Sequence, residues 1–335
     1  MRETAKRESA HRGNRRTVRR LVIVLAALIV MLASLIYMIH YESTRRWIIR
    51  ANERYSALYA APTLEPTSVP TPTAATERTS TPIPTSTPAP SPSPASMPAF
   101  AVAVDVTRAP LATPDANTLM YAMETPPPPQ ESFADLLALN PESVGFLTIE
   151  DVLTLPVVQR PNDNEFYLDH SFDLTESIAG TLFMDGSNLL VPEDDCLIIY
   201  GHNMRNGTMF RPLIQYENPD FLKQNPLAHF DTLYENRLYV PFAALTVTAD
   251  PDSERYLNLR QLSFDEPGFN RFIKSLKALS IWTNPLEVKY GDRVLLLVTC
   301  EYTHDNGRFI LALRAQRDDE AWDQLWAQVQ ESEMK

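Results

Sequence analysis

A proline-rich tract places the strongest limit on what this chain can fold into. Of its 28 prolines, 17 fall between residues 62 and 129, mixed with Thr, Ser and Ala. This composition cannot bury a hydrophobic core and favours extended polyproline-like conformations. At about 3.1 Å per residue the tract would reach on the order of 200 Å, which predicts a disordered stalk. A proline-rich ligand for a recognition domain is the alternative.

An apolar stretch precedes this tract. Leu21 to Ile39 holds no charged residue, proline or glycine, and as a helix it would span about 28 Å, enough to cross a bilayer. Eight basic residues precede it and four arginines follow, so we expect the N-terminus to remain in the cytoplasm. The stretch is too long for a signal peptide, and no A-x-A cleavage pattern follows it. We therefore expect an uncleaved anchor, with a cleaved signal as the alternative.

These features divide the chain into four segments. We expect a basic cytoplasmic segment at 1–20, a transmembrane helix at 21–39, a juxtamembrane segment and Pro/Ser/Thr-rich linker at 40–130, and one extracellular domain at 131–335. The last segment is long enough for a sizeable core. It carries 33 acidic and 16 basic residues, whereas residues 1–60 carry 4 acidic and 12 basic ones. An acidic domain argues against binding nucleic acid.

Short β-rich runs dominate this domain. They predict strands at 144–149, 155–159, 180–185, 197–200, 238–248, 293–299 and 308–314. Helices are expected at 132–139, 208–216, 265–280 and 318–331. Pro241 within the longest strand indicates an edge or a bulge. Seven or eight strands with few short helices predict a mainly β fold, a closed or nearly closed barrel.

Three polar residues stand at the ends of apolar runs. His202 follows the run that begins at Cys196, Cys300 ends the run from Leu295, and Arg308 opens the next run. Strands ending this way bring their terminal side chains to a sheet edge. A thiol, an imidazole and a guanidinium gathered there would supply a nucleophile, an acid/base and an oxyanion partner. The alternatives are an inert cysteine or a disulfide between Cys196 and Cys300.

The segment between Cys300 and Arg308 decides whether these two residues meet. Asn306-Gly307 is a strong hairpin signal, and a strict two-residue turn there would set Cys300 opposite Leu313. Arg308 would then lie about 16 Å from Cys300. The catalytic interpretation needs instead a wide loop with Cys300 and Arg308 at its two rims. The residues alone leave both registers open.

At the level of motifs the domain resembles the sortase family, most closely its class B branch. The resemblance is carried by Tyr200-Gly-His-Asn, followed by Gly207-Thr-Met-Phe and Leu213, and by a strand ending in Thr-Cys300 with an Arg opening the next strand. It covers nearly all of 131–315, and a helix near 265–280 is typical of class B. One departure is Leu296, where the family has Thr. Further matches are Val144-Gly-Phe146, Pro156-Val-Val-Gln159, Asp163-Asn164, Tyr167-Leu168 and Gly180 to Asp185.

The resemblance implies a role for each residue. Cys300 would attack the carbonyl of a Thr within a C-terminal sorting motif of a secreted protein, and an amine would resolve the thioacyl enzyme. His202 would act as acid and base, and Arg308 would hold the substrate and stabilise the oxyanion. Residues lining the peptide groove in relatives correspond to Asn164, Leu168, Thr299 and Glu301, each of which could equally be structural.

The sequence gives weaker signals about the roles of the other histidines and about cofactors. His304 lies in the loop before Arg308 without a motif, and His170 and His229 are interpreted as structural. The spacing of these residues does not indicate a metal site, and the chemistry requires no cofactor.

The resemblance thus implies a membrane-anchored cysteine transpeptidase that fixes secreted proteins to the cell wall of a Gram-positive-type bacterium, with a peptidoglycan precursor as amine acceptor. Joining pilin subunits is the variant, with a pilin amine as acceptor. A cysteine endopeptidase that only hydrolyses is the second enzyme hypothesis, although papain-like proteases place the cysteine before the histidine. An inactive adhesive or scaffold domain with the same fold is the non-enzyme alternative.

Overall fold

A closed barrel forms the centre of the computed structural model, which describes residues 2–59, 126–248, 250, 252–300 and 307–335, with the backbone alone for 2–24 and 300. The strands follow the order β1-β2-β3-β4-β8-β9-β6-β5 around the barrel. The predicted mainly β barrel is thereby confirmed. The strands are β1 (Ser143–Ile149), β2 (Leu153–Val158), β3 (Leu182–Met184), β4 (Cys196–Tyr200), β5 (Ala228–Thr232), β6 (Asn236–Thr248), β8 (Val294–Cys300) and β9 (Gly307–Ala315).

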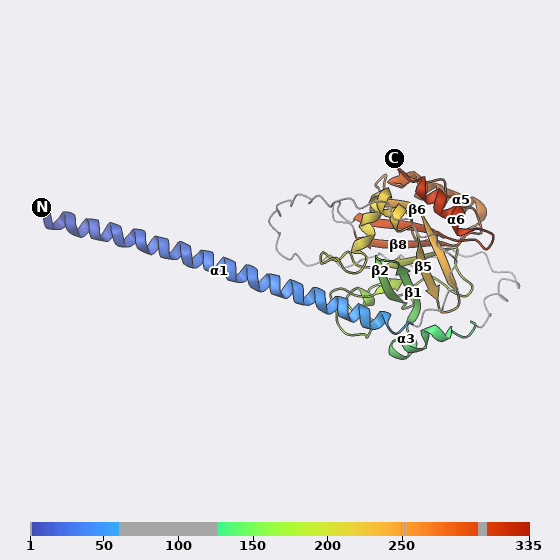
Figure 1. Ribbon diagram of the computed structural model, residues 1–335, viewed down its shortest axis with the longest axis horizontal. Coiled ribbons are helices and arrows are strands. Elements are labelled where there is room, and N and C mark those ends of the chain that lie inside the picture. The colour runs from blue at the N-terminus through green and yellow to red at the C-terminus, as the bar shows by residue number, and fades with distance from the viewer. Residues whose placement is uncertain (1, 60–125, 249, 251, 301–306) are drawn as a thin grey trace, which may run out of the picture.

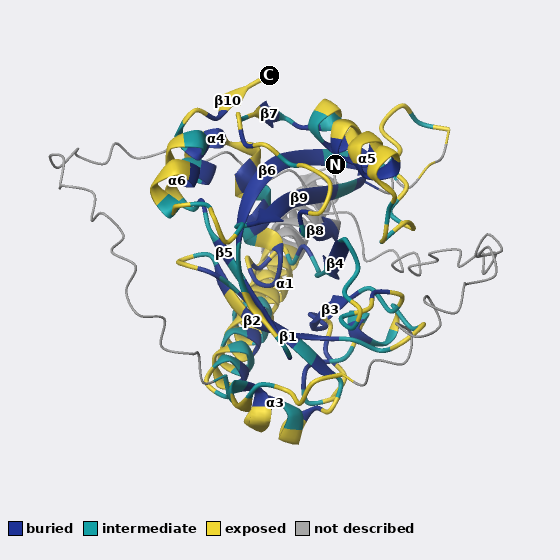
Figure 2. Ribbon diagram, turned by 90° about the vertical axis from the view of Figure 1, so that its right-hand side faces the viewer, coloured by how far each residue is buried: buried dark blue, intermediate teal, exposed yellow. Residues whose placement is uncertain are grey.

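The core lies on both faces of the strands that carry the candidate residues. Leu295, Leu297 and Leu311 are fully buried, as are most of their neighbours in β8 and β9, and Figure 2 shows β6, β8 and β9 as buried along most of their length. Continuous Leu, Ile and Val runs form such strands because every side chain finds an apolar neighbour. β6 bends at Pro241, where the register against β9 shifts. Of the two predictions for this proline, the bulge is therefore correct, since a closed barrel leaves β6 no free edge.

Helices and short strands cover the barrel. α5 starts where the Asp265 carboxylate accepts a hydrogen bond from Gly268 N (2.9 Å), an N-cap that matches the prediction for 265–280. Strand β5, which closes the barrel between β1 and β6, was not predicted because its Ala-His-Phe-Asp-Thr sequence lacks an apolar run. The covering elements are α3 (Ala134–Leu139), α4 (Pro219–Gln224), α5 (Glu266–Leu279), α6 (Trp322–Gln330), the 3-10 turns η1 (Glu131–Phe133), η2 (Phe166–Leu168) and η3 (Arg211–Glu217), and the pair β7 (Trp282–Thr283) and β10 (Glu333–Met334).

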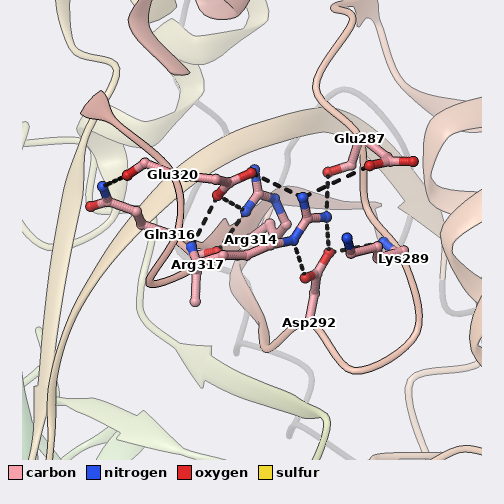
Figure 3. A network of polar contacts seen from close by, with 8 residues as sticks. Glu287, Lys289, Asp292, Arg314, Gln316, Arg317 and Glu320 are labelled. Carbon is pink, nitrogen blue, oxygen red and sulfur yellow. Dashed lines mark hydrogen bonds and ion pairs between the residues drawn. The ribbon is translucent and has the colours of Figure 1, made fainter. Parts of the chain in front are cut away.

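A buried ion-pair network ties the ends of β8 and β9 that lie away from Cys300 (Figure 3). The guanidinium of Arg314, only 1 % exposed, donates to both carboxylate oxygens of Glu320 (2.6 and 3.0 Å). Glu320 also accepts from Arg317 (2.9 Å), which in turn donates to Asp292 (2.7 Å). These bonds hold residues 317–320 in a turn, so α6 begins at Trp322 and not at the predicted Asp318.

Glu320→Gln is expected to lower the free energy of unfolding by about 2 kcal/mol, because the buried Arg314 loses its charged partner. Burial alone would raise the pKa of Glu320, but hydrogen bonds from Arg314 and Arg317 hold it below its ordinary value. This stabilisation is therefore present above the unfolded pKa and is lost as the pH falls through the lower folded pKa. Urea unfolding at pH 7 measures the effect. The exposed neighbour Asp319→Asn, as control, should change stability by less than about 0.5 kcal/mol.

The N-terminal part of the chain is one continuous helix, α1 (Arg2–Ser56), which projects from the barrel as a long rod (Figure 1). Among the described residues it is the one helix long and apolar enough to cross a membrane, over Leu25–Ser56. Its C-terminal turns pack on the barrel, where Ile48 and Tyr55 are buried. From the sequence we expected a juxtamembrane segment here, without any packing on the barrel. The proline-rich tract, predicted to be a stalk, lies outside the described residues except for residues 126–129.

Candidate active site

Two parallel strands deliver His202 and Cys300 to the same end of the barrel. β4 pairs with β8 so that Tyr200 lies opposite Val298, and Gly201 N donates to Val298 O (3.1 Å). His202 and Cys300 each lie two residues further along. Adjacent strands run about 4.8 Å apart, so the two residues leave the sheet side by side, as predicted from the strand ends.

The register between β8 and β9 shows whether Cys300 lies opposite Leu313 or opposite Arg308, which the sequence left open. Cys300 pairs directly with Arg308, Thr299 with Phe309 and Leu295 with Leu313. The strict two-residue turn is therefore wrong, and Cys300 lies directly opposite Arg308, as the catalytic interpretation requires. Directly opposite residues in an antiparallel pair have Cα atoms about 4.5–5.5 Å apart, so the backbones of Cys300 and Arg308 are neighbours.

A disulfide between the two cysteines is excluded by the same registers. Cys196 pairs with Val294 at the start of β8, whereas Cys300 ends that strand. Six residues of strand separate the two positions by about 20 Å, far beyond the 7 Å limit for a disulfide. Cys196 is a free, buried thiol, and burial raises its pKa far above the ordinary value. It is the inert core cysteine that its place in an apolar run predicts.

His202 is held by a backbone carbonyl. Its Nε2 lies 2.6 Å from Leu168 O, and since a carbonyl can only accept, Nε2 carries the proton. Burial lowers the pKa of His202, with the hydrogen bond to Leu168 O acting in the opposite direction. Gly180, whose φ is 60°, leaves room for the carbonyl oxygen of Leu168. A Cβ at this position would lie only 2.8 Å from that oxygen.

A hydrogen-bond chain that was not predicted starts from Tyr200, two residues before His202. Tyr200 Oη and Asn164 Nδ2 both donate to Asp185 Oδ2 (3.1 Å each), and Gly186 N donates to Asn164 Oδ1 (2.7 Å). Burial, and then Asp185, raise the pKa of Tyr200, while the charge of Arg308 acts against the shift. Asn164 thus braces the turn that follows β3, where Asp185 N donates to Ile198 O (2.9 Å). The only sequence signal for this hydrogen-bond network was that Asn164, Tyr200 and Asp185 match positions of the family.

The other predicted groove residues differ in their surroundings. Leu168 is half-buried and takes part through its carbonyl. Thr299 is 2 % exposed, and its hydroxyl has no hydrogen-bond partner within the described part of the chain. Glu301 lies outside the described residues.

The other histidines of the domain have different surroundings or lie outside the described residues. His170 stacks on the Phe166 ring (centroids 3.9 Å apart), and its Nδ1 is near both Phe166 O and Asp169. These contacts suit the structural role predicted for it. His229 belongs to β5, on the other side of the barrel. His304 lies outside the described residues.

Comparison with known proteins gives a consistent result. No protein-family model matches the chain. It is 31 % identical over 185 residues to a sortase B of Listeria monocytogenes, a match covering 54 % of this chain and 73 % of the relative. Among solved structures, it is similar to a Staphylococcus aureus sortase B–substrate complex, with 25 % identity, a TM-score of 0.52 and coverage of 61 % of this chain and 92 % of that one. A sortase B complexed with triglycine has 26 % identity, a TM-score of 0.50 and coverage of 56 % and 86 %.

The barrel, the order of its motifs and these relatives agree with one another. The chain therefore belongs to the sortase family, in its class B branch. It is a cysteine transpeptidase.

Proposed function

We propose that this transpeptidase is anchored in the cell membrane and cleaves a C-terminal sorting motif of secreted proteins after Thr. It then transfers the acyl group to an amine of the cell wall. The observation that carries the proposal is the pairing of Cys300 with Arg308, on the strand beside the one that delivers His202. A strict two-residue turn at Asn306-Gly307 would not have allowed this pairing.

The proposed reaction has two steps. The Cys300 thiol gives its proton to neutral His202 as the sulfur forms a bond to the Thr carbonyl carbon. The C–N bond then breaks, and His202 passes this proton to the departing amine. The incoming amine then bonds to the same carbon, His202 takes its proton, and the C–S bond breaks to release Cys300. Arg308 stabilises the negative oxygen in both steps, for which a permanently charged guanidinium is suited.

The comparisons support a peptide substrate and an amine acceptor. One relative was solved as a substrate complex and another with triglycine. We extend both ligand classes to this chain. The groove that binds the peptide would be lined by Asn164, Leu168, Thr299 and Glu301.

The membrane part of the proposal rests on α1. Its apolar residues from Leu25 to Ile39 are widely exposed, and basic residues are concentrated before them. Exposed apolar side chains over this length favour a bilayer as their surroundings. We infer a single-pass protein with a cytoplasmic N-terminus and an extracellular catalytic domain.

Product analysis tests the reaction. The full chain in detergent is incubated with a library of Thr-containing sorting peptides, with and without triglycine. We expect triglycine to convert the cleaved product into a triglycine-linked amide and to suppress the free acid, because both compete for one thioacyl enzyme. Mass spectrometry of the trapped intermediate identifies the preferred motif. Hydrolysis that triglycine leaves unchanged would favour the endopeptidase hypothesis instead.

A further inference from the structure

The helix that is proposed to anchor this protein also touches the loop that follows His202. Tyr41 Oη donates to Arg205 O (3.1 Å), and Arg45 Nε donates to Asn206 O (2.9 Å). The loop returns to the site, since Phe210 N donates to His202 O (2.9 Å). The contacts therefore connect α1 to the catalytic end of the barrel, where β4, β8 and β9 bring His202, Cys300 and Arg308.

These contacts lie very close to the end of the apolar span. Ile39 is the last residue of the predicted span, and α1 continues through it without a break. At about 1.5 Å per residue, Tyr41 lies about 3 Å and Arg45 about 9 Å beyond Ile39 along the helix axis. The loop that follows His202 is hydrogen-bonded to both Tyr41 and Arg45. It therefore lies at nearly the same height above the bilayer as these two residues.

The packing of α1 fixes this orientation. Positions 41, 45, 48, 52 and 55 share one face of a helix. Ile48 and Tyr55 on this face are each only 2 % exposed, and Asn52 Nδ2 donates to Met209 Sδ (3.6 Å) in the same loop. Further on, Ser56 Oγ donates to Thr154 O (2.6 Å) in β2. Contacts over four turns hold the barrel to the helix at both ends of this face.

The proline-rich tract does not set the height of the barrel. Three residues before it, Tyr59 Oη donates to Asp231 Oδ2 (2.7 Å). Beyond it, Gln130 N donates to Leu233 O (2.8 Å), two residues along from Asp231. The tract thus leaves and re-enters the domain at one place, so its contour length adds nothing between membrane and site. This departs from the predicted arrangement, in which the barrel stood at the end of a stalk.

We propose that the catalytic end of the barrel lies against the lipid headgroups of the membrane that α1 spans. The partner of this surface is the headgroup layer itself. Exposed Arg46, Arg50 and Arg205 lie on α1 and on the loop, and cationic side chains are attracted to a layer of anionic headgroups. Tyr37 and Trp47, both exposed, flank the exit point, as aromatic residues do at membrane interfaces. The inference rests on the membrane anchoring proposed above.

Lipid-dependent quenching tests the proposal. The full chain carries Cys300→Ala, so that the buried Cys196 is the only native thiol, together with Arg205→Cys or Asp318→Cys for a fluorescent label. Asp318 is the matched exposed control. It lines the same groove as Ser56, which is fifteen residues and about 22 Å beyond Tyr41 along α1. Vesicles contain four parts phosphatidylcholine to one part phosphatidylglycerol, with some lipid carrying a nitroxide on its headgroup.

We expect the label at residue 205 to be quenched several-fold more strongly than the label at residue 318. Weak or equal quenching at both positions, in protein that stays with the vesicles after an alkaline carbonate wash, would overturn the proposed surface and leave the anchoring intact. Protein that the wash removes from the vesicles would overturn the anchoring and this inference together.

Discussion

Cys300→Ala is expected to abolish formation of the thioacyl enzyme and to reduce amide production by at least about 10⁴-fold. No other described thiol can replace it, since Cys196 lies about 20 Å away at the opposite end of β8 and is buried. The measurement is the rate of triglycine-linked product for a peptide that wild type cleaves, together with mass spectrometry of the trapped intermediate.

The second cysteine provides the matched control. Cys196→Ala removes a sulfur from the core next to Val294, so we expect a loss of roughly 1 kcal/mol in stability. Activity per folded molecule should stay at the wild-type level. Cys300→Ala should show the reverse pattern, with unchanged urea unfolding and no transfer. Equal turnover by wild type and Cys300→Ala would refute the assignment of the nucleophile.

The sequence was sufficient for those parts of the fold that depend on local patterns. Buried strands such as β4, β8 and β9 are continuous Leu, Ile and Val runs, and these were predicted to within one or two residues. The amphipathic α5 was recognised because Phe269, Phe272, Ile273 and Leu276 recur at helical spacing, and all four are buried. The resemblance to sortases added the order of the motifs and hence the expected barrel.

Features that depend on long-range pairing could not be predicted in this way. β5 contains His229 and Asp231 and is a strand because β1 and β6 flank it, which no local pattern reveals. The register at Cys300 is another case, since Asn306-Gly307 locally favours a tight turn, whereas β8 pairs with β9 in a register that such a turn does not allow. Likewise, the face of α1 from Tyr41 to Tyr55 could not be recognised as a contact surface from the sequence, because the barrel that packs on it is formed by distant residues.

His202→Gln is expected to reduce the transfer rate by about 10²–10⁴-fold, the usual contribution of a general acid–base group. Glutamine has an amide N–H that can take the place of the Nε2 donor to Leu168 O, so the loop position is preserved while proton transfer is lost. Unchanged urea unfolding would show that the fold is intact. The comparison therefore isolates the proton-transfer role of His202 from its structural one.

His229→Gln is the matched control, because burial lowers the pKa of both histidines, while His229 lies in β5 outside the proposed site. We expect wild-type rates for it, and an equal loss in both variants would contradict the role given to His202. The pH dependence gives a second check. Aminolysis needs neutral His202 as the base, and its pKa lies below the ordinary 6.5. The neutral form thus dominates at pH 7, and the wild-type rate of this step should fall only at more acidic pH, a dependence that His202→Gln should lack.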